Sequence, residues 1–204
     1  MTSFHFEDIP FELIMNQATI PDPILDNQGS YTRGDLVRFP VQMRVQLIDG
    51  WMIIPPPVPE VHQNIIAELM YQWTRYLKEE ELPFKAVSSP VRFSRMEDDR
   101  TVLIPDLAVV RHPESILCPD IHVLPDFVAE VTTRGTNCLD HVIKSRIYRD
   151  WGVKEYWIIN PQTSCIEIHD FKTSSGEPTE THAFGASVPV RSYAGFSIHT
   201  AEFL

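Results

Sequence analysis

Residues 127–133 read FVAEVTT, and this apolar, β-favouring run contains one ionisable side chain, Glu130. A second run of this kind, TVLIPDLAVV at residues 101–110, contains Asp106 directly after a proline. Runs that are apolar at nearly every position are typical of central strands buried on both faces. The two segments therefore predict central strands, each with a carboxylate in a place where charge is costly.

Other segments supply the elements around these strands. A hairpin is expected at Asp49–Gly50, between two β-favouring runs. Apolar residues recur at helical spacing over roughly residues 60–80 and again over 139–151, and Gly152 is placed to end the second helix. Further strands are predicted at residues 85–96 and 155–159, and short C-terminal strands in CIEIHDF, SVPVRS and GFSIHT.

This order of elements predicts an α/β (α+β) fold with a mixed central β-sheet flanked by helices. The 204 residues fit one domain with a substantial core. Residues 1–30 are rich in Pro, Asp and Asn and are expected to form an extended or loosely attached arm, with the domain at 31–204.

The formal net charge of −11 argues against a sequence-blind DNA coat, which needs concentrated Lys and Arg. The charge is uneven, because residues 131–154 carry five basic and two acidic residues, a local balance of +3 beside Glu130. Three widely spaced cysteines fit free thiols in a reducing cytoplasm. No membrane span or signal peptide is predicted, so we expect a cytoplasmic protein.

Buried carboxylates are normally paired, protonated or bound to metal. If Asp106 and Glu130 converge from neighbouring strands, their oxygens suit Mg²⁺, which takes one or two carboxylates and completes its shell with water and phosphate oxygens. Lys144, on the helix that follows Glu130, could point its ammonium at the same place and stabilise a phosphoryl group.

Simpler interpretations compete with this one. Either acid could face solvent or a turn, and Lys144 could be an ordinary exposed lysine. Asp140 and Lys144 are four residues apart, which suits a pair on a helix surface. His62 opens the first helix and has a role only if that helix start faces the carboxylates. No zinc-ligand spacing, Gly-rich phosphate loop or Gly-x-Ser-x-Gly turn is present in the sequence.

The region from about residue 31 to 204 resembles the Uma2 family of restriction-endonuclease-like proteins. The resemblance is carried by the hairpin LIDG, His62, IPDLAVV, EVTT, Asp140, Lys144, Tyr148, GVKEYW, the NP turn and the closing AGFSIHTAEFL. It implies a PD-(D/E)xK nuclease-like fold.

The resemblance also implies roles. Asp106 and Glu130 would be metal carboxylates, and the backbone carbonyl of Val131 could add a ligand. Many such nucleases have a lysine two residues after the glutamate; here Thr132 stands there, so the lysine role would pass to Lys144. Two departures are Gln46, where the family usually has Glu, and Thr133, where it usually has Ser.

The leading hypothesis is an endonuclease that uses Mg²⁺ or Mn²⁺ to hydrolyse DNA, with Asp106, Glu130 and Lys144 catalytic and Gln46, His62 and Asp140 accessory. The alternative, favoured by Gln46 and the net charge, is a catalytically inactive nuclease-fold protein that binds nucleic acid or a protein partner. A third reading treats the acids as a structural network. By analogy with restriction enzymes, a homodimer is expected.

Overall fold

The computed structural model describes residues 27–40, 43–111, 120–173 and 177–203. Its centre is a six-stranded sheet in the order β10–β9–β8–β7–β5–β3. The strands are β3 (Phe84–Ser88), β5 (Leu107–Arg111), β7 (Phe127–Val131), β8 (Glu155–Asn160), β9 (Cys165–Asp170) and β10 (Glu180–Ala183). Strands β7 and β8 are parallel and every other neighbouring pair is antiparallel, so the predicted mixed sheet is confirmed.

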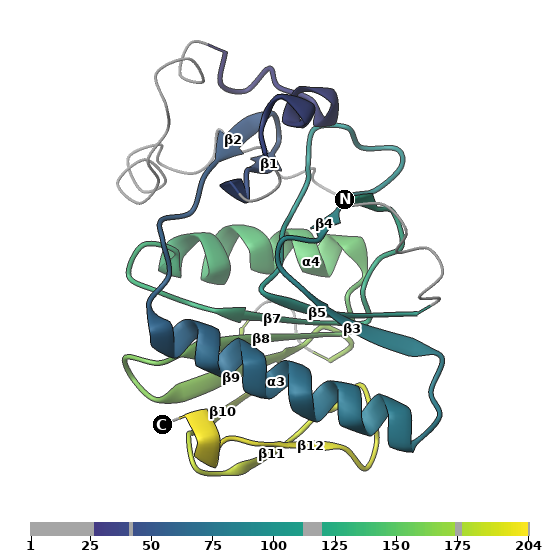
Figure 1. Ribbon diagram of the computed structural model, residues 1–204, viewed down its shortest axis with the longest axis vertical. Coiled ribbons are helices and arrows are strands. Elements are labelled where there is room, and N and C mark those ends of the chain that lie inside the picture. Colours follow the sequence, from purple (N-terminus) through teal and green to yellow (C-terminus); the bar gives the residue numbers. More distant parts are fainter. Residues whose placement is uncertain (1–26, 41–42, 112–119, 174–176, 204) are drawn as a thin grey trace.

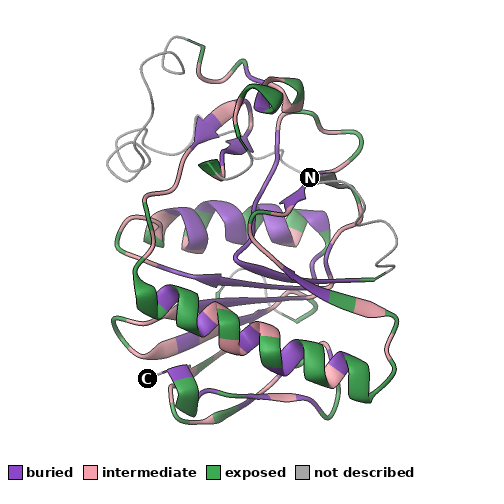
Figure 2. Ribbon diagram, viewed as in Figure 1, coloured by how far each residue is buried: buried purple, intermediate pink, exposed green. Residues whose placement is uncertain are grey.

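Helices cover both faces of this sheet (Figure 1). Helix α3 (Glu60–Glu79) lies on one face, and the helical segment η5 (Leu139–Lys144), which continues into α4 (Ser145–Trp151), lies on the other. Figure 2 shows that α3 has one buried and one exposed side. Its buried apolar residues, Ile65, Leu69, Trp73 and Leu77, recur at helical spacing, which is why this segment forms an amphipathic helix.

Smaller elements surround the sheet. The predicted hairpin is present as β1 (Gln46–Ile48) and β2 (Trp51–Ile53). Strands β11 (Ser187–Pro189) and β12 (Ser197–His199) form a second hairpin, which lies beside α3 in Figure 1. Strands β4 (Arg92–Phe93) and β6 (Asp120–Ile121) make a short parallel pair. Two 3₁₀ helices, η2 (Arg33–Arg38) and η6 (Ala201–Phe203), complete the described elements.

The strand predicted at 101–110 is shorter than expected. Only its second half pairs in the sheet, as β5, whereas Val102 and Leu103 make isolated bridges to Leu47 and Phe93. Pro105 has no N–H to give to a ladder, and the N–H of Asp106 donates to the carboxylate of Glu130 instead. The break therefore lies beside the carboxylates and turns the chain from the sheet toward the β1–β2 hairpin.

Two other predictions were incomplete. The strand expected at 85–96 is divided into β3 and β4, with Pro90 between them. Strand β10 was not predicted, because ETHA is a polar edge strand without apolar alternation. Two tryptophans, Trp73 on α3 and Trp157 on β8, are fully buried in the core.

The predicted N-terminal arm, residues 1–30, lies mostly outside the described residues. Its last part is attached to the hairpin, because the backbone N–H groups of Gly29 and Tyr31 both donate to the carbonyl of Gly50. Cys118 is also outside the described residues, and Cys138 and Cys165 are free thiols. No helix in the described ranges has the length and apolar character that crossing a membrane requires.

Glu155 fixes the C-terminal segment to the sheet. This carboxylate is fully buried at the start of β8. Its Oε1 accepts hydrogen bonds from Trp157 Nε1 (2.7 Å) and the backbone N–H of Arg191 (3.1 Å). Its Oε2 accepts from the backbone N–H (2.6 Å) and the hydroxyl (2.7 Å) of Ser192. Both carboxylate oxygens therefore act as acceptors. A neutral amide of the same shape has one acceptor oxygen instead of two.

We therefore predict that Glu155→Gln lowers the free energy of unfolding by about 2–4 kcal/mol, because an amide NH₂ would face N–H donors. Urea denaturation followed by tryptophan fluorescence measures the loss. Glu79→Gln, at an exposed position on α3, is the matched control and is expected to change stability by less than about 0.5 kcal/mol. Equal unfolding midpoints for the two variants would contradict this role of Glu155.

Candidate functional site

The register between β5 and β7 places the two carboxylates on one face of the sheet. Leu107 pairs with Ala129, so the residue before Leu107, Asp106, lies opposite the residue after Ala129, Glu130. Residues directly opposite in an antiparallel pair project to the same side. Each acid also bonds to the other segment: Asp106 N–H donates to Glu130 Oε2 (3.3 Å), and Val131 N–H donates to Asp106 Oδ2 (3.0 Å).

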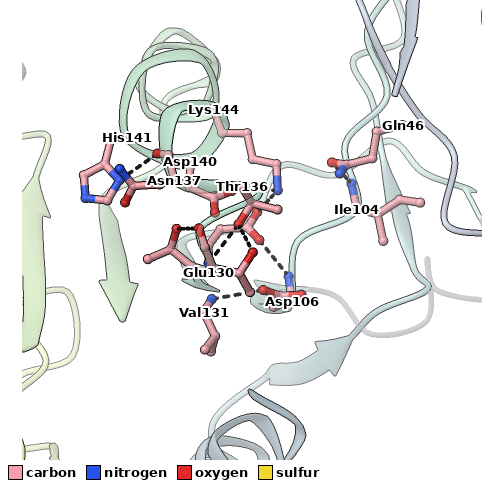
Figure 3. Close-up of polar contacts among 12 residues, drawn as sticks. Gln46, Ile104, Asp106, Glu130, Val131, Thr136, Asn137, Asp140, His141 and Lys144 are labelled. Carbon is pink, nitrogen blue, oxygen red and sulfur yellow. Dashed lines mark hydrogen bonds and ion pairs between the residues drawn. The ribbon is translucent and has the colours of Figure 1, made fainter. Parts of the chain in front are cut away.

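Glu130 is held from the helix above it. Its Oε1 accepts hydrogen bonds from Lys144 Nζ (2.9 Å) and from the hydroxyl of Tyr148 (2.8 Å). Figure 3 shows Glu130 between Lys144 and Asp106, with the lysine pointing down from the helix toward the sheet. The convergence of Asp106, Glu130 and Lys144 expected from the sequence is therefore present, and all three are buried.

Asp106 is held from two other segments. Arg44, in the segment before β1, donates from Nη2 to Asp106 Oδ1 at 2.9 Å. His62 Nε2, in the first turn of α3, lies 3.0 Å from Asp106 Oδ2. Since the carboxylate is an acceptor, Nε2 of His62 carries the proton in this contact. The condition set for His62 is met: the helix start does face the carboxylates.

Asp140 and Lys144 do not form a surface pair. Both are buried, and Lys144 Nζ lies 3.2 Å from Asp140 Oδ1 and also contacts Glu130. The first six residues of the predicted helix form a π-helix, η5, which replaces one α-helical turn by a wider one. Such turns often occur at functional sites. Val142, an apolar residue of this segment, is exposed.

Gln46 lines a small cavity together with the two acids, but its side chain makes its hydrogen bond to a different segment. Its side-chain oxygen accepts a hydrogen bond from Ile104 N–H (3.1 Å), the pair seen to one side in Figure 3. Gln46 therefore positions the segment that leads into Asp106. Thr132 is buried two residues after Glu130 and brings no positive charge to that position.

The cavity among these side chains has a volume of about 20 Å³. A single water needs about 10–15 Å³, so this space suits one water or one small ion. Among the described residues, no three His, Cys, Asp or Glu side chains are arranged as a ready metal site. The donor set nevertheless fits Mg²⁺ or Mn²⁺, which bind through one or two carboxylates plus water. Such an ion would replace Arg44 or Lys144 as the partner of a carboxylate.

The two carboxyl groups have very different pKa values because their surroundings differ. Burial acts to raise the pKa of Asp106, but the hydrogen bond from His62 and the positive charges around it lower this pKa to about 2. Burial raises the pKa of Glu130 to about 8, opposed by Lys144 and assisted by Asp106 and Asp140. Within the described ranges, three carboxyl groups meet two permanent cations, Lys144 and Arg44, so one carboxyl readily holds a proton.

Lys144 is charged in this setting. Burial alone would lower the pKa of its ammonium, but Glu130, Asp140 and Asp106 together raise it above its ordinary value. Burial, together with the Glu130 and Asp140 carboxylates, raises the pKa of Tyr148, which therefore acts as a hydrogen-bond donor. The site thus offers a fixed ammonium and a fixed hydroxyl on one side of Glu130.

Sequence analysis did not identify Arg44 or Tyr148 as site residues. Tyr148 had a usable signal, because it follows Lys144 by four residues and so lies on the same face of the helix. Arg44 had none: it comes from an irregular segment and has a left-handed backbone (φ 53°) that is uncommon for arginine. The role of the Val131 carbonyl stays a prediction, although Val131 lines the cavity.

Comparison with protein families gives a match over residues 35–201 to the family Uma2, described as "Putative restriction endonuclease". The chain belongs to the Uma2 family. The match covers most of the chain, including every residue of the site. The expected resemblance is thereby confirmed, while the roles of single Uma2 residues stay predictions.

A solved structure supports the fold. The chain is similar to a nuclease of the DUF820 group from Anabaena variabilis, described as putative, with a TM-score of 0.66 and 17% sequence identity. The similarity covers 84% of this chain and 96% of the other. The restriction-endonuclease-like fold predicted for this Uma2 protein is thus confirmed. A comparison with curated proteins finds no match.

The pKa of Glu130 predicts a pH dependence of stability. This pKa is about 8 in the folded protein and ordinarily 4.5, so the folded state binds more protons between these values. The free energy of unfolding should therefore fall as pH rises through this window. We predict that Glu130→Gln flattens the fall, measured by urea denaturation at several pH values.

The control for this measurement is Glu79→Gln. Glu79 is exposed on α3 and contacts Arg75, whose guanidinium does not titrate in this pH window. It is expected to leave the slope of stability against pH as in the wild type. A slope that is the same in all three proteins would show that Glu130 does not carry the proton.

Proposed function

We propose that this Uma2 protein is a nuclease that hydrolyses phosphodiester bonds of DNA and depends on Mg²⁺ or Mn²⁺. One observation carries the proposal: two buried carboxylates, from paired segments of the sheet, and one buried ammonium converge on a cavity the size of a small ion. The family description and the fold of the DUF820 structure support a nuclease as the general class.

Asp106 and Glu130 would hold the ion, with the Val131 carbonyl as a further ligand. A bound divalent ion lowers the pKa of its water and polarises phosphate oxygens. The protein's own contribution is orientation. Tyr148 and Lys144 fix Glu130 on one side, and Val131 N–H and His62 fix Asp106 on the other. Carboxylates held this firmly lose little freedom when they bind a ligand.

Lys144 would stabilise the negative charge that develops on the phosphoryl group. The raised pKa of its ammonium keeps it charged, and its contacts with Glu130 and Asp140 keep it at the cavity. Preorganised charge of this kind is effective because no solvent reorganisation is needed during the reaction. Asp140 would act by placing Lys144.

We predict that the wild-type protein cleaves plasmid DNA with Mg²⁺ or Mn²⁺, and that Asp106→Asn, Glu130→Gln and Lys144→Met each lower the rate by about 100-fold or more. The Lys144 substitution keeps chain length while removing charge. Gel analysis of nicked and linear products measures the rate, and thermal unfolding reports whether each variant folds.

Matched controls are Asp150→Asn and Lys78→Met, which remove the same charges at exposed positions. Both should cleave at the wild-type rate. Equal rates in the site variants and these controls would show that any cleavage does not use this site.

A second candidate function has specific support. Arg44 and Lys144 occupy the carboxylate oxygens that an ion would need, and Gln46 contributes an amide where the family usually has an acid. These features favour a catalytically inactive protein that keeps the nuclease fold to bind nucleic acid or a protein partner. Uptake of Mn²⁺ separates the two functions, because only the nuclease requires it.

Gln46→Glu tests how far the amide limits the site. Glutamate is nearly the same shape, and one of its oxygens can still accept the hydrogen bond from Ile104 N–H. It adds a negative charge to the wall of the small cavity. We predict a rise in Mn²⁺ affinity of about tenfold, measured by isothermal titration calorimetry. Unchanged or weaker affinity would mean that Gln46 lies outside the ion's coordination shell.

A further inference from the structure

A second, larger cavity adjoins the carboxylates from outside. Its volume is about 320 Å³, within the range of pockets that hold small ligands. It lies between the first turns of α3 and the segment after β3. Arg44, His62 and Asp106 line both this outer pocket and the small inner cavity. The outer pocket therefore begins where the candidate metal site ends.

The walls of the outer pocket carry polar side chains whose donors and acceptors are not used by other described residues. Gln63, Ser88 and Ser89 line it, and their side chains make no hydrogen bond to any other described residue. Ile66 and Pro90 supply an apolar side. Neutral donors next to an apolar wall suit the sugar–phosphate backbone of a nucleic acid, which alternates charged and apolar surface.

Arg44 supplies the positive charge of this pocket. Its guanidinium gives one donor, Nη2, to Asp106 and has four further N–H groups. Its side chain is 23% exposed, so part of it reaches the pocket. Its Nε is buried and makes no hydrogen bond within the part of the chain that the structure describes. A left-handed backbone holds the residue here at some cost in energy, as is common in functional sites.

We propose that the outer pocket binds a phosphodiester group of the nucleic-acid substrate next to the one that is cleaved, with Arg44 bridging Asp106 and that phosphate. The first turn of α3 adds the positive end of the helix dipole, since His62 and Gln63 both line the pocket there. Arg44 thus sets the position of the strand relative to the carboxylates. This inference rests on the proposed function for the identity of the ligand.

Binding can be tested without cleavage. The probe is a short, fluorescently labelled oligothymidylate, titrated by anisotropy in EDTA and again with Ca²⁺. Arg44→Gln is expected to weaken binding by about 10- to 100-fold, because a charged hydrogen-bonding pair is lost. Arg44→Lys should recover part of the affinity, since it keeps the charge but loses the planar donor geometry.

The variant that leaves the carboxylates untouched is Gln63→Glu. Gln63 is exposed in the first turn of α3, where an acid is compatible with helix stability. A carboxylate there would repel phosphate in the pocket, and we expect about three- to tenfold weaker binding. The matched control is Asn64→Glu, which adds the same charge one residue along, outside the pocket, and should bind as the wild type does.

Competition by inorganic phosphate shows whether the pocket binds any phosphate or requires the nucleic-acid backbone. Displacement of the oligonucleotide by free phosphate at millimolar concentration would show a pocket that takes any phosphate. Resistance to it would show that the pocket needs the nucleic-acid backbone. Both results support a phosphate site. Equal affinity of Gln63→Glu and Asn64→Glu, or unchanged affinity in Arg44→Gln, would overturn the inference.

These outcomes are separate from those of the cleavage assay. If binding depends on Arg44 and Gln63 but the protein does not cleave DNA, the phosphate site is supported and the proposed nuclease activity is contradicted. If the protein cleaves DNA and both variants bind as the wild type does, the nuclease activity is supported and the phosphate site is contradicted.

Discussion

The antiparallel pairing of Leu107 with Ala129 is the constraint on which the site depends. It sets Asp106 opposite Glu130, and each residue's carboxylate then accepts a hydrogen bond from the backbone of the other segment. A slip of one residue in this register would move one carboxylate to the opposite face, against α3 and its apolar core. The apolar residues of β5 hold the register because they fill two separate cores, Leu107 and Val109 on one face and Ala108 and Val110 on the other.

The buried charges form a network that is stable and still carries an excess of negative charge. Asp106, Glu130 and Asp140 are removed from water, and Lys144 and Arg44 only partly balance them. A cluster of this kind is costly unless every member is paired, and here each acid contacts at least one cation or proton donor. The remaining imbalance favours taking up a proton or a divalent ion. Metal binding and proton release at Glu130 would therefore be linked.

The sequence was enough to predict that helices flank a mixed sheet and that Asp106, Glu130 and Lys144 lie close together. The acids were visible because each interrupts an apolar strand, and Lys144 because of the family pattern. The contacts that hold them were less visible. Arg44 comes from a segment without periodicity, and the π-helical turn that buries Asp140 leaves no mark in the apolar pattern. Strand β10 was missed because polar edge strands lack alternation. The break at Pro105 was missed because apolar runs stand on both sides of the Pro105–Asp106 pair.

The most direct test of the account is a crystal of the protein soaked with Mn²⁺ and measured at a wavelength that gives anomalous scattering from manganese. The account predicts one strong peak within coordination distance of both the Asp106 and the Glu130 carboxylates, with the guanidinium of Arg44 or the ammonium of Lys144 displaced from its present partner. A map without a peak between these carboxylates, with the Arg44 and Lys144 ion pairs intact, would contradict it and leave the acids as a structural network.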